Sequence, residues 1–417
     1  MATTSADRIL SLDIIRGIAV MGIFSVNVVG MAMIEFAYFY PPAYGFESVW
    51  DRVLWAGNML VVDGRFRSLF SILFGASMVL VIERAVAAGK KGWQVHYPRM
   101  IVLLLFGLAH YYFFWWGDIL SNYALVGMIA YVFWRLGTRW LLIASVLSLS
   151  ILYVPGIVDG VGQLTGPPPQ EAAADEAAKA EDEGPSQEEQ FAADVAEDKA
   201  AHASLGAHLD YVIEHNTWRP FKSVPGYGLE TLGLMLLGMA GYKSGFLTGA
   251  WSRRRYRLVA AATLIPSFLY YGFVVQQTLR TGYAQELYWP WAWGMPTYLH
   301  PMAAMGYAAV IILLVVRQGP LAERFAAVGR TAFTNYLGAT MIGTVLFYGF
   351  GFGLYGELSR SQAWLAVPAV WTLMLLWSKP WLDRFRYGPF EWAWRSLSRW
   401  KWEPMRKRAA TEAVAAV

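Results

Sequence analysis

A histidine and an aspartate lie close together in an apolar part of this sequence, where two hydrophobic runs meet at the short link 116–118. His110 lies in the first run and Asp118 lies in the link. Ionisable side chains at membrane depth are costly, so each is a candidate for function. A histidine can act as general base on a hydroxyl or amine, and an aspartate can orient it. Alternatively, His110 ties two helices together and Asp118 caps the next helix. Asn122 and Tyr123 follow, and we predict that they contact substrate.

A second polar group, DGRFRSLF, stands where another apolar run begins. We predict that its members Asp63, Arg65 and Arg67 bind substrate. Guanidinium groups suit carboxylates and phosphates, so the two arginines are candidates for clamping an anionic group. The alternative is an Asp–Arg pair that anchors the helix at the interface. Glu230 and His300 are single candidates for the same substrate site.

A third set of polar residues lies at the other ends of the apolar runs. Asp13 and Arg16, in SLDIIRG, have the i, i+3 spacing of a pair on one helix face. Arg330 and Asn335 belong to GRTAFTNYLG. We predict that these four residues form a binding site for a cofactor-like donor, with Arg16 meeting the phosphates of a cytosolic nucleotide-like molecule. The alternatives are a positive-inside anchor for Arg16 and interhelical hydrogen bonding for Asn335.

The composition indicates that all these residues lie in a membrane protein. Of the 417 residues, 56% are hydrophobic and 15% are charged, against about 25% charged in soluble domains. Several stretches reach the roughly 20 apolar residues that a helix needs to cross a bilayer. We therefore expect an all-α, polytopic transmembrane bundle whose main partner is the lipid bilayer. The expected spans are 13–33, 66–85, 97–115, 119–136, 140–161, 229–242, 258–275, 298–316, 331–352 and 364–381.

The placement of basic residues predicts the orientation of these ten spans. With the N-terminus inside, 25 of the 34 lysines and arginines fall in cytoplasmic segments, as the positive-inside rule requires. Both termini are then cytoplasmic, and the link 116–118 faces outward. We expect a multi-pass protein of a bacterial inner membrane. The stretch 50–62 is expected to form a short helix that is either interfacial or re-entrant.

Shifts in composition divide the chain into four parts. Residues 1–164 and 226–386 are two membrane halves of about five spans each. Residues 165–225 form an outer loop, and 170–200 within it hold 11 acidic and 2 basic residues. Such a segment is predicted to be disordered or a solvated helix, and is either a tolerated insertion or a partner-binding segment. Residues 387–417 form a basic, tryptophan-rich tail that favours anionic lipid over nucleic acid.

Several classes of function are excluded or receive no support. The chain has no cysteine, which excludes disulfides, thiolate metal sites and a cysteine nucleophile. It contains no Walker A loop, no dinucleotide fingerprint and no HExxH motif, and we expect no metal site. No small-residue cleavage site follows the first apolar run, so we expect that run to remain as an anchor.

Five segments resemble one known family, in the same order along nearly the whole chain. They are SLDIIRGIAVMGIFSVN, DGRFRSLFSILFGAS, FGLAHYYFFWWGDILSNYALVG, GRTAFTNYLG and FRYGPFEWAWRSL. They resemble the YeiB-like bacterial inner-membrane proteins, whose domain of unknown function carries the number 418. That family is distantly similar to transmembrane acyltransferases, which move an acyl group from cytosolic acyl-CoA to a sugar or lipid. In the lysosomal member of that group the histidine follows the first span. Residues 35–64 contain no histidine, so here His110 would take its role.

The residues and the resemblance together support three hypotheses. In the first, an acyltransferase-like protein uses acyl-CoA as donor, His110 as base, Asp118 as its orienter and Arg16 at the donor mouth. This hypothesis predicts a continuous polar path between Arg16 and His110. In the second, the protein transports or exports a small metabolite. In the third, it is a non-catalytic membrane scaffold.

Overall fold

The computed structural model describes residues 9–165, 187–294, 297–315 and 319–407, and every regular element in these ranges is helical. The acidic insert is described from residue 187 onward, and its earlier part lies outside the described residues. The elements are α1 (Leu10–Ala32), α2 (Glu35–Phe39), η2 (Pro41–Ala43), α3 (Val49–Val61), α4 (Arg65–Ala87), α5 (Gly92–Phe113), α6 (Leu120–Ala130), η3 (Tyr131–Phe133), α7 (Thr138–Thr165), α9 (Gln187–Ala201), α10 (Leu205–Asn216), α11 (Arg219–Lys222), α12 (Val224–Lys243), α13 (Arg253–Arg280), α14 (Gln285–Trp289), η4 (Pro290–Gly294), α15 (Leu299–Val315), α16 (Pro320–Arg330), α17 (Ala332–Phe347), α18 (Arg360–Trp364), α19 (Ala366–Arg384) and α20 (Pro389–Ser398).

The expected all-α, membrane-type fold is confirmed at this level. In the part of the chain that the structure describes, five helical segments are long and apolar enough to cross a membrane, or six if the bent pair α14/η4–α15 is counted as one span. Helices α6 and α17 are apolar but shorter. Each of the ten predicted spans contains a helix in the described chain. The stretch 50–62 corresponds to α3, which together with α4 makes one candidate segment of 39 residues. At about 1.5 Å per residue that is about 58 Å, longer than a bilayer is thick.

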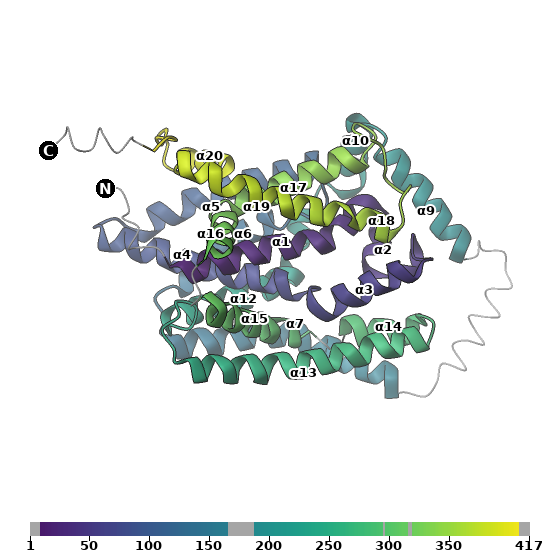
Figure 1. The fold of residues 1–417 in the computed structure, drawn as a ribbon, viewed down its shortest axis with the longest axis horizontal. Coiled ribbons are helices and arrows are strands. Elements are labelled where there is room, and N and C mark those ends of the chain that lie inside the picture. Colours follow the sequence, from purple (N-terminus) through teal and green to yellow (C-terminus); the bar gives the residue numbers. More distant parts are fainter. Residues whose placement is uncertain (1–8, 166–186, 295–296, 316–318, 408–417) are drawn as a thin grey trace.

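Helix α1 forms the centre of the bundle. Buried residues make up 78% of its most apolar stretch, against 28% for α7 and for α13. Helix α1 packs against α4, α15, α16, α17 and α19, whereas α7 packs mainly on α12, and α13 on α15. In Figure 1, α1 runs through the middle, and α13 lies along the outer edge. The apolar side chains that α7 and α13 expose are consistent with association with a lipid bilayer.

The bundle has two distinct ends. The start of α1 and helix α20 lie together at the left in Figure 1, and we call this the terminal end. Helices α2, α9, α10 and α18 lie at the right, which we call the distal end. Thus the first and last described helices share one end of the molecule.

Glycines set the closest helix contacts. A Cβ added to Gly238 of α12 would overlap the backbone carbonyl of Ile72 on α4, and one on Gly75 of α4 would overlap that of Met235 on α12. Small residues let helix backbones approach in this way, and van der Waals packing then holds membrane helices together. Because α12 also packs on α6 and α7, helices from the two halves of the chain interleave.

Candidate functional site

The hairpin of α5 and α6 brings His110 and Asp118 together. Gly107 of α5 lies against the backbone of Ser121, where a Cβ would overlap it, so the two helices can meet closely. His110 Nδ1 and Asp118 Oδ1 are 2.9 Å apart, and their side chains are 2% and 1% exposed. The hydrogen bond expected from the sequence is therefore present.

Asp118 also accepts hydrogen bonds from the first turn of α6. Its Oδ2 accepts hydrogen bonds from the backbone N–H of Ser121 at 2.8 Å and from the Ser121 hydroxyl at 2.6 Å. Its Oδ1 accepts from the N–H of Leu120 at 3.1 Å. The orienting and capping roles thus coexist in one carboxylate. These bonds hold the carboxylate rigidly against His110.

The geometry leaves one nitrogen of His110 available. A carboxylate at Nδ1 favours the tautomer that is protonated there, so Nε2 carries the lone pair. Nε2 is buried and has no hydrogen-bond partner among the described residues. A buried polar atom without a partner is costly. Nε2 is thus available to accept a proton from a bound ligand.

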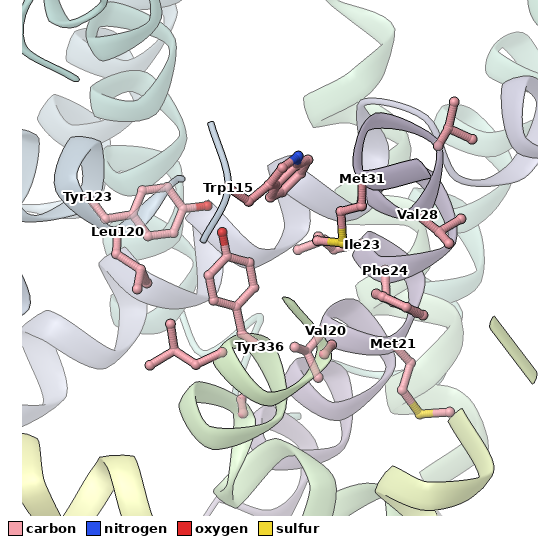
Figure 2. Close-up of a cluster of buried hydrophobic side chains, with 14 of the residues drawn as sticks. Val20, Met21, Ile23, Phe24, Val28, Met31, Trp115, Leu120, Tyr123 and Tyr336 are labelled. Carbon is pink, nitrogen blue, oxygen red and sulfur yellow. The ribbon is translucent and has the colours of Figure 1, made fainter. Parts of the chain in front are cut away.

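Aromatic rings surround this pair. The ring of Tyr336, from α17, lies 5.3 Å from that of His110, centroid to centroid. Trp115 donates from Nε1 to the carbonyl of Gly30 at 2.9 Å, which fastens the hairpin link to α1. Figure 2 shows Trp115, Tyr123 and Tyr336 around one space, with the two phenol oxygens directed into it.

A cavity of about 310 Å³ lies at the terminal end, and Tyr336 is one of the residues that line it. Its inner wall is mostly apolar and comes from α4, α5, α6 and α17. Its outer part is basic. The inner wall includes Phe70, Phe74, Met78, Leu103, Leu120, Tyr123 and Tyr336, and the charged side chains are Asp13, Arg16, Arg84, Arg99, Arg330, Arg386, Glu391 and Arg395. His110 does not line the cavity. The continuous polar path predicted from Arg16 to His110 is therefore not found among the described residues, because the inner wall is mostly apolar and stops short of His110.

Of the four residues predicted to bind a donor, three line this cavity and one does not. Arg16 pairs with Asp13 at 3.2 Å and donates to Ser77 at 2.6 Å, and Arg330 lines the same space. Asn335 lies outside it. The Asn335 amide donates to the carbonyl of Val328 and accepts from Trp377, so it links neighbouring helices.

Helix α20 supplies one wall of the cavity, which sequence reasoning missed. Arg99 of α5 lies over the ring of Trp394 at 4.2 Å, and Arg395 lies over Tyr387 at 4.6 Å. The sequence predicted a basic tail that favours anionic lipid, and it did not predict that α20 packs on α5 and α17. The alternation of arginines and aromatic residues in FRYGPFEWAWR was the available signal.

Glu391 fastens α20 to α17. Its carboxylate accepts from the backbone N–H of Phe333 at 2.7 Å and of Thr334 at 3.1 Å, and from the Thr334 hydroxyl at 2.5 Å. The first turn of α17 is thus capped by a side chain from another helix. Burial raises the pKa of the Glu391 carboxyl above its ordinary value, and the hydrogen bonds that it accepts oppose that rise.

A second polar cluster contains most of the other predicted substrate-binding residues. Arg67 pairs with Glu230 at 2.9 Å, and Tyr153 donates to the same carboxylate at 2.6 Å. The charge of Arg67 is therefore already matched. Tyr123 connects this cluster with the cavity, because its hydroxyl and that of Ser71 are 2.6 Å apart and Ser71 donates to the Arg67 carbonyl.

Arg65 is fully buried beside this cluster. Its guanidinium lies 3.6 Å above the ring of Tyr271. The ring of His300 also stacks with Tyr271, at 5.9 Å between centroids. One nitrogen donates to the backbone carbonyls of Met59 and Asp63, while Nε and the other terminal nitrogen lack partners among the described residues. These two nitrogens thus keep unused hydrogen-bond donors, and Arg65 lines neither of the two cavities.

Asp63, whose backbone carbonyl accepts from Arg65, and Asn122 belong to neither the dyad nor the Arg67–Glu230 ion pair. Asp63 lines a cavity of about 20 Å³ together with Asn58 and Arg360, a volume that accommodates about one water molecule. Asn122 lies on α6, and its Oδ1 is buried without a partner in the described chain. The structure thus divides the predicted site residues among a cavity, a dyad, an ion-pair cluster and this small polar void.

Comparison with known proteins assigns the family. A family model described as "Protein of unknown function (DUF418)" matches residues 241–401. The uncharacterized protein YeiB of Escherichia coli is 32% identical over 94% of this chain and 96% of its own length. The chain belongs to the DUF418 family. The uncharacterized protein YxaH of Bacillus subtilis is 30% identical over 97% of this chain and 98% of its own length. No solved structure matches the chain.

The region matched by the DUF418 model carries part of the candidate site. Residues 241–401 contain Arg330, Tyr336, Arg386 and Glu391, the parts of the cavity that α16, α17 and α20 supply. His110 and Asp118 lie outside that region but within the length over which YeiB and YxaH align. The dyad and the cavity wall thus come from different parts of the family's chain.

Proposed function

We propose that the protein transfers an acyl group from cytosolic acyl-CoA to a hydroxyl or amine acceptor on the other side of a bacterial inner membrane. The observation that carries this proposal is the cavity, which connects a basic mouth with the aromatic ring that touches His110. Transfer across a membrane requires the donor to come close to the base, and the ring of Tyr336 is shared by the cavity lining and the surroundings of His110.

The charges at the mouth suit a phosphorylated donor. Six arginines face two acids there. Guanidinium groups bind phosphate oxygens in pairs and retain their charge. The inner part is walled by phenylalanine, leucine and methionine side chains, and suits an uncharged acyl thioester. Arg16 and Arg330 would then hold the donor's phosphates, and Asp13 would orient Arg16 through their ion pair.

The chemistry follows from the dyad. His110 Nε2 takes the proton of the acceptor hydroxyl or amine, and Asp118 stabilises the resulting imidazolium. The acceptor atom bonds to the thioester carbonyl carbon, the C–S bond breaks, and the proton passes to the departing thiolate of CoA. Arg65, with unused donors, and Asp63 would bind the acceptor on the distal side, while Arg67 and Glu230 shape that region as an ion pair.

This proposal requires ten spans with the terminal end in the cytoplasm. Because the chain has no cysteine, single cysteines report topology without background. Ala88, at the end of α4, and Glu214, on α10, are both exposed. We expect a membrane-impermeant maleimide to label Glu214→Cys in intact spheroplasts and Ala88→Cys only after lysis. The reverse pattern would overturn the orientation.

Release of CoA tests the function. Protein in lipid discs would receive acetyl-CoA or longer acyl-CoAs together with a small alcohol or amine as acceptor, and a thiol reagent would report CoA, since the chain itself has no thiol. We expect release, and a KM for acyl-CoA that rises about 10- to 100-fold in Arg386→Gln, as loss of a hydrogen bond to a charged group implies. Arg254→Gln, exposed on α13, is the control. If the protein released no CoA and bound no donor, the proposal would be overturned.

One observation favours transport as a second candidate. The pair α14/η4–α15 is bent by 50°, and broken helices are common in transporters. Transport predicts counterflow of a labelled metabolite in vesicles with acyl-CoA left intact. Acyl transfer predicts consumption of acyl-CoA, so the two assays separate the candidates.

A further inference from the structure

The hydroxyl of Tyr336 occupies the junction between the cavity and the dyad. Tyr336 is 3% exposed, lines the inner end of the cavity and lies against the ring of His110. Because His110 does not line the cavity, a group that enters from the basic mouth meets this phenol before it meets the base.

The hydroxyl also retains hydrogen-bonding capacity. It donates to the carbonyl of Gly117 at 3.4 Å, which is longer than an ordinary O–H···O bond of about 2.5–3.0 Å. The backbone N–H of Ile119 is a second neighbour of the same oxygen. The neighbouring phenol, Tyr123, is by contrast close to the hydroxyl of Ser71, at 2.6 Å. Tyr336 can therefore redirect its proton towards a ligand at little cost.

The phenol is held rigidly from both sides. Glu391 caps the first turn of α17, at Phe333 and Thr334, immediately before Tyr336. Helix α17 packs along α1. Donors that are placed before the reaction stabilise developing charge most effectively, because they need no reorganisation.

We propose that the Tyr336 hydroxyl donates a hydrogen bond to the acyl carbonyl oxygen of the donor and stabilises its negative charge in the transition state. This inference rests on the proposed acyl transfer. As the acceptor attacks, the carbonyl π electrons move onto the oxygen. The Tyr336 hydroxyl donates a hydrogen bond to that oxygen. When the C–S bond breaks, the electron pair on the oxygen re-forms the carbonyl. The thiolate leaves and takes the proton from His110. Tyr336 keeps its own proton throughout.

Tyr336→Phe tests this role, because it removes one oxygen and keeps the ring that packs on His110. We expect the rate of CoA release from acetyl-CoA to fall about 10²–10³-fold, as for loss of one oxyanion donor, with KM changed less than about twofold. The matched control is Tyr256→Phe, a buried phenol that donates to the Phe246 carbonyl at 2.6 Å, away from the cavity. We expect that variant to keep the wild-type rate.

A spectroscopic readout separates this role from a structural one. With carbonyl-labelled acetyl-CoA bound, the C=O stretch should lie at lower frequency in the wild type than in water, and should move up in Tyr336→Phe. The wild-type band needs no variant, so the test holds even if Tyr336→Phe folds poorly. A wild-type band at or above the frequency in water would overturn the inference.

The failures of the two proposals differ. If His110→Gln loses CoA release and Tyr336→Phe keeps both rate and band position, acyl transfer stands and the role of Tyr336 is wrong. A raised KM with an unchanged kcat in Tyr336→Phe would likewise overturn that role. If the wild type neither binds acetyl-CoA nor releases CoA, both proposals fail together.

Discussion

His110→Gln is expected to lower the rate of CoA release by about 10²–10⁴-fold, the contribution typical of a general base. Glutamine can still donate towards Asp118, so the hairpin should keep its shape. It has no atom at the position of Nε2 that accepts a proton at neutral pH. Binding of acyl-CoA at the mouth should be unchanged, because His110 does not line the cavity.

Two further variants make this prediction specific. His215→Gln changes an exposed histidine on α10 and should leave the rate unaltered. Asp118→Asn keeps an oxygen for the N–H of Ser121 but removes the charge that orients His110, so it should lower the rate by a smaller factor. A wild-type rate in His110→Gln would contradict its assignment as the base.

Gly238→Leu is expected to prevent the bundle from assembling. Any side chain at this position overlaps the backbone of Ile72, which cannot move aside as a flexible side chain would. Overpacking usually costs about 1–3 kcal/mol, and separating α4 from α12 should cost more than the upper end of that range. We expect little monodisperse protein after extraction into detergent, and a strongly lowered unfolding temperature for any that remains.

Gly272→Leu is the control for the packing prediction. Gly272 lies within α13, and a Cβ there would meet no atom within 4 Å. The same substitution, also within a long helix, should therefore yield protein that resembles the wild type in amount and unfolding temperature. Equal behaviour of the two variants would show that the α4–α12 contact tolerates a side chain.

Local patterns were sufficient to predict the helices and the dyad. The runs on either side of 116–118 are apolar and the link is short, so α5 and α6 had to be neighbours, and His110 and Asp118 fell within reach. The partners of Arg67 could not be predicted in this way. Arg67 and Glu230 were both predicted to bind substrate, yet they bind each other. That pairing depends on the contact between α4 and α12, which are distant in the sequence. Glycines allow this contact, but their positions in the sequence do not predict it.

The basic mouth was predicted only in part, for a similar reason. Arg16 and Arg330 stood out because they begin or end apolar runs. Arg386 and Arg395 lie in a segment that is amphipathic and aromatic, a pattern that also suits the membrane surface. The carboxylate of Glu391 decides between these placements, because its bonds to Phe333 and Thr334 hold α20 against the bundle.

The wall supplied by α20 has a consequence for biosynthesis. Among the described residues, every candidate membrane-spanning helix precedes Arg386, so these helices can be inserted before the wall that α20 supplies has been translated. The site is therefore finished after insertion. A chain clipped by a protease just beyond α19 would remain embedded and largely folded, yet its cavity would lack one side and α17 would lack its cap. C-terminal shortening is thus a way to silence this protein without removing it from the membrane.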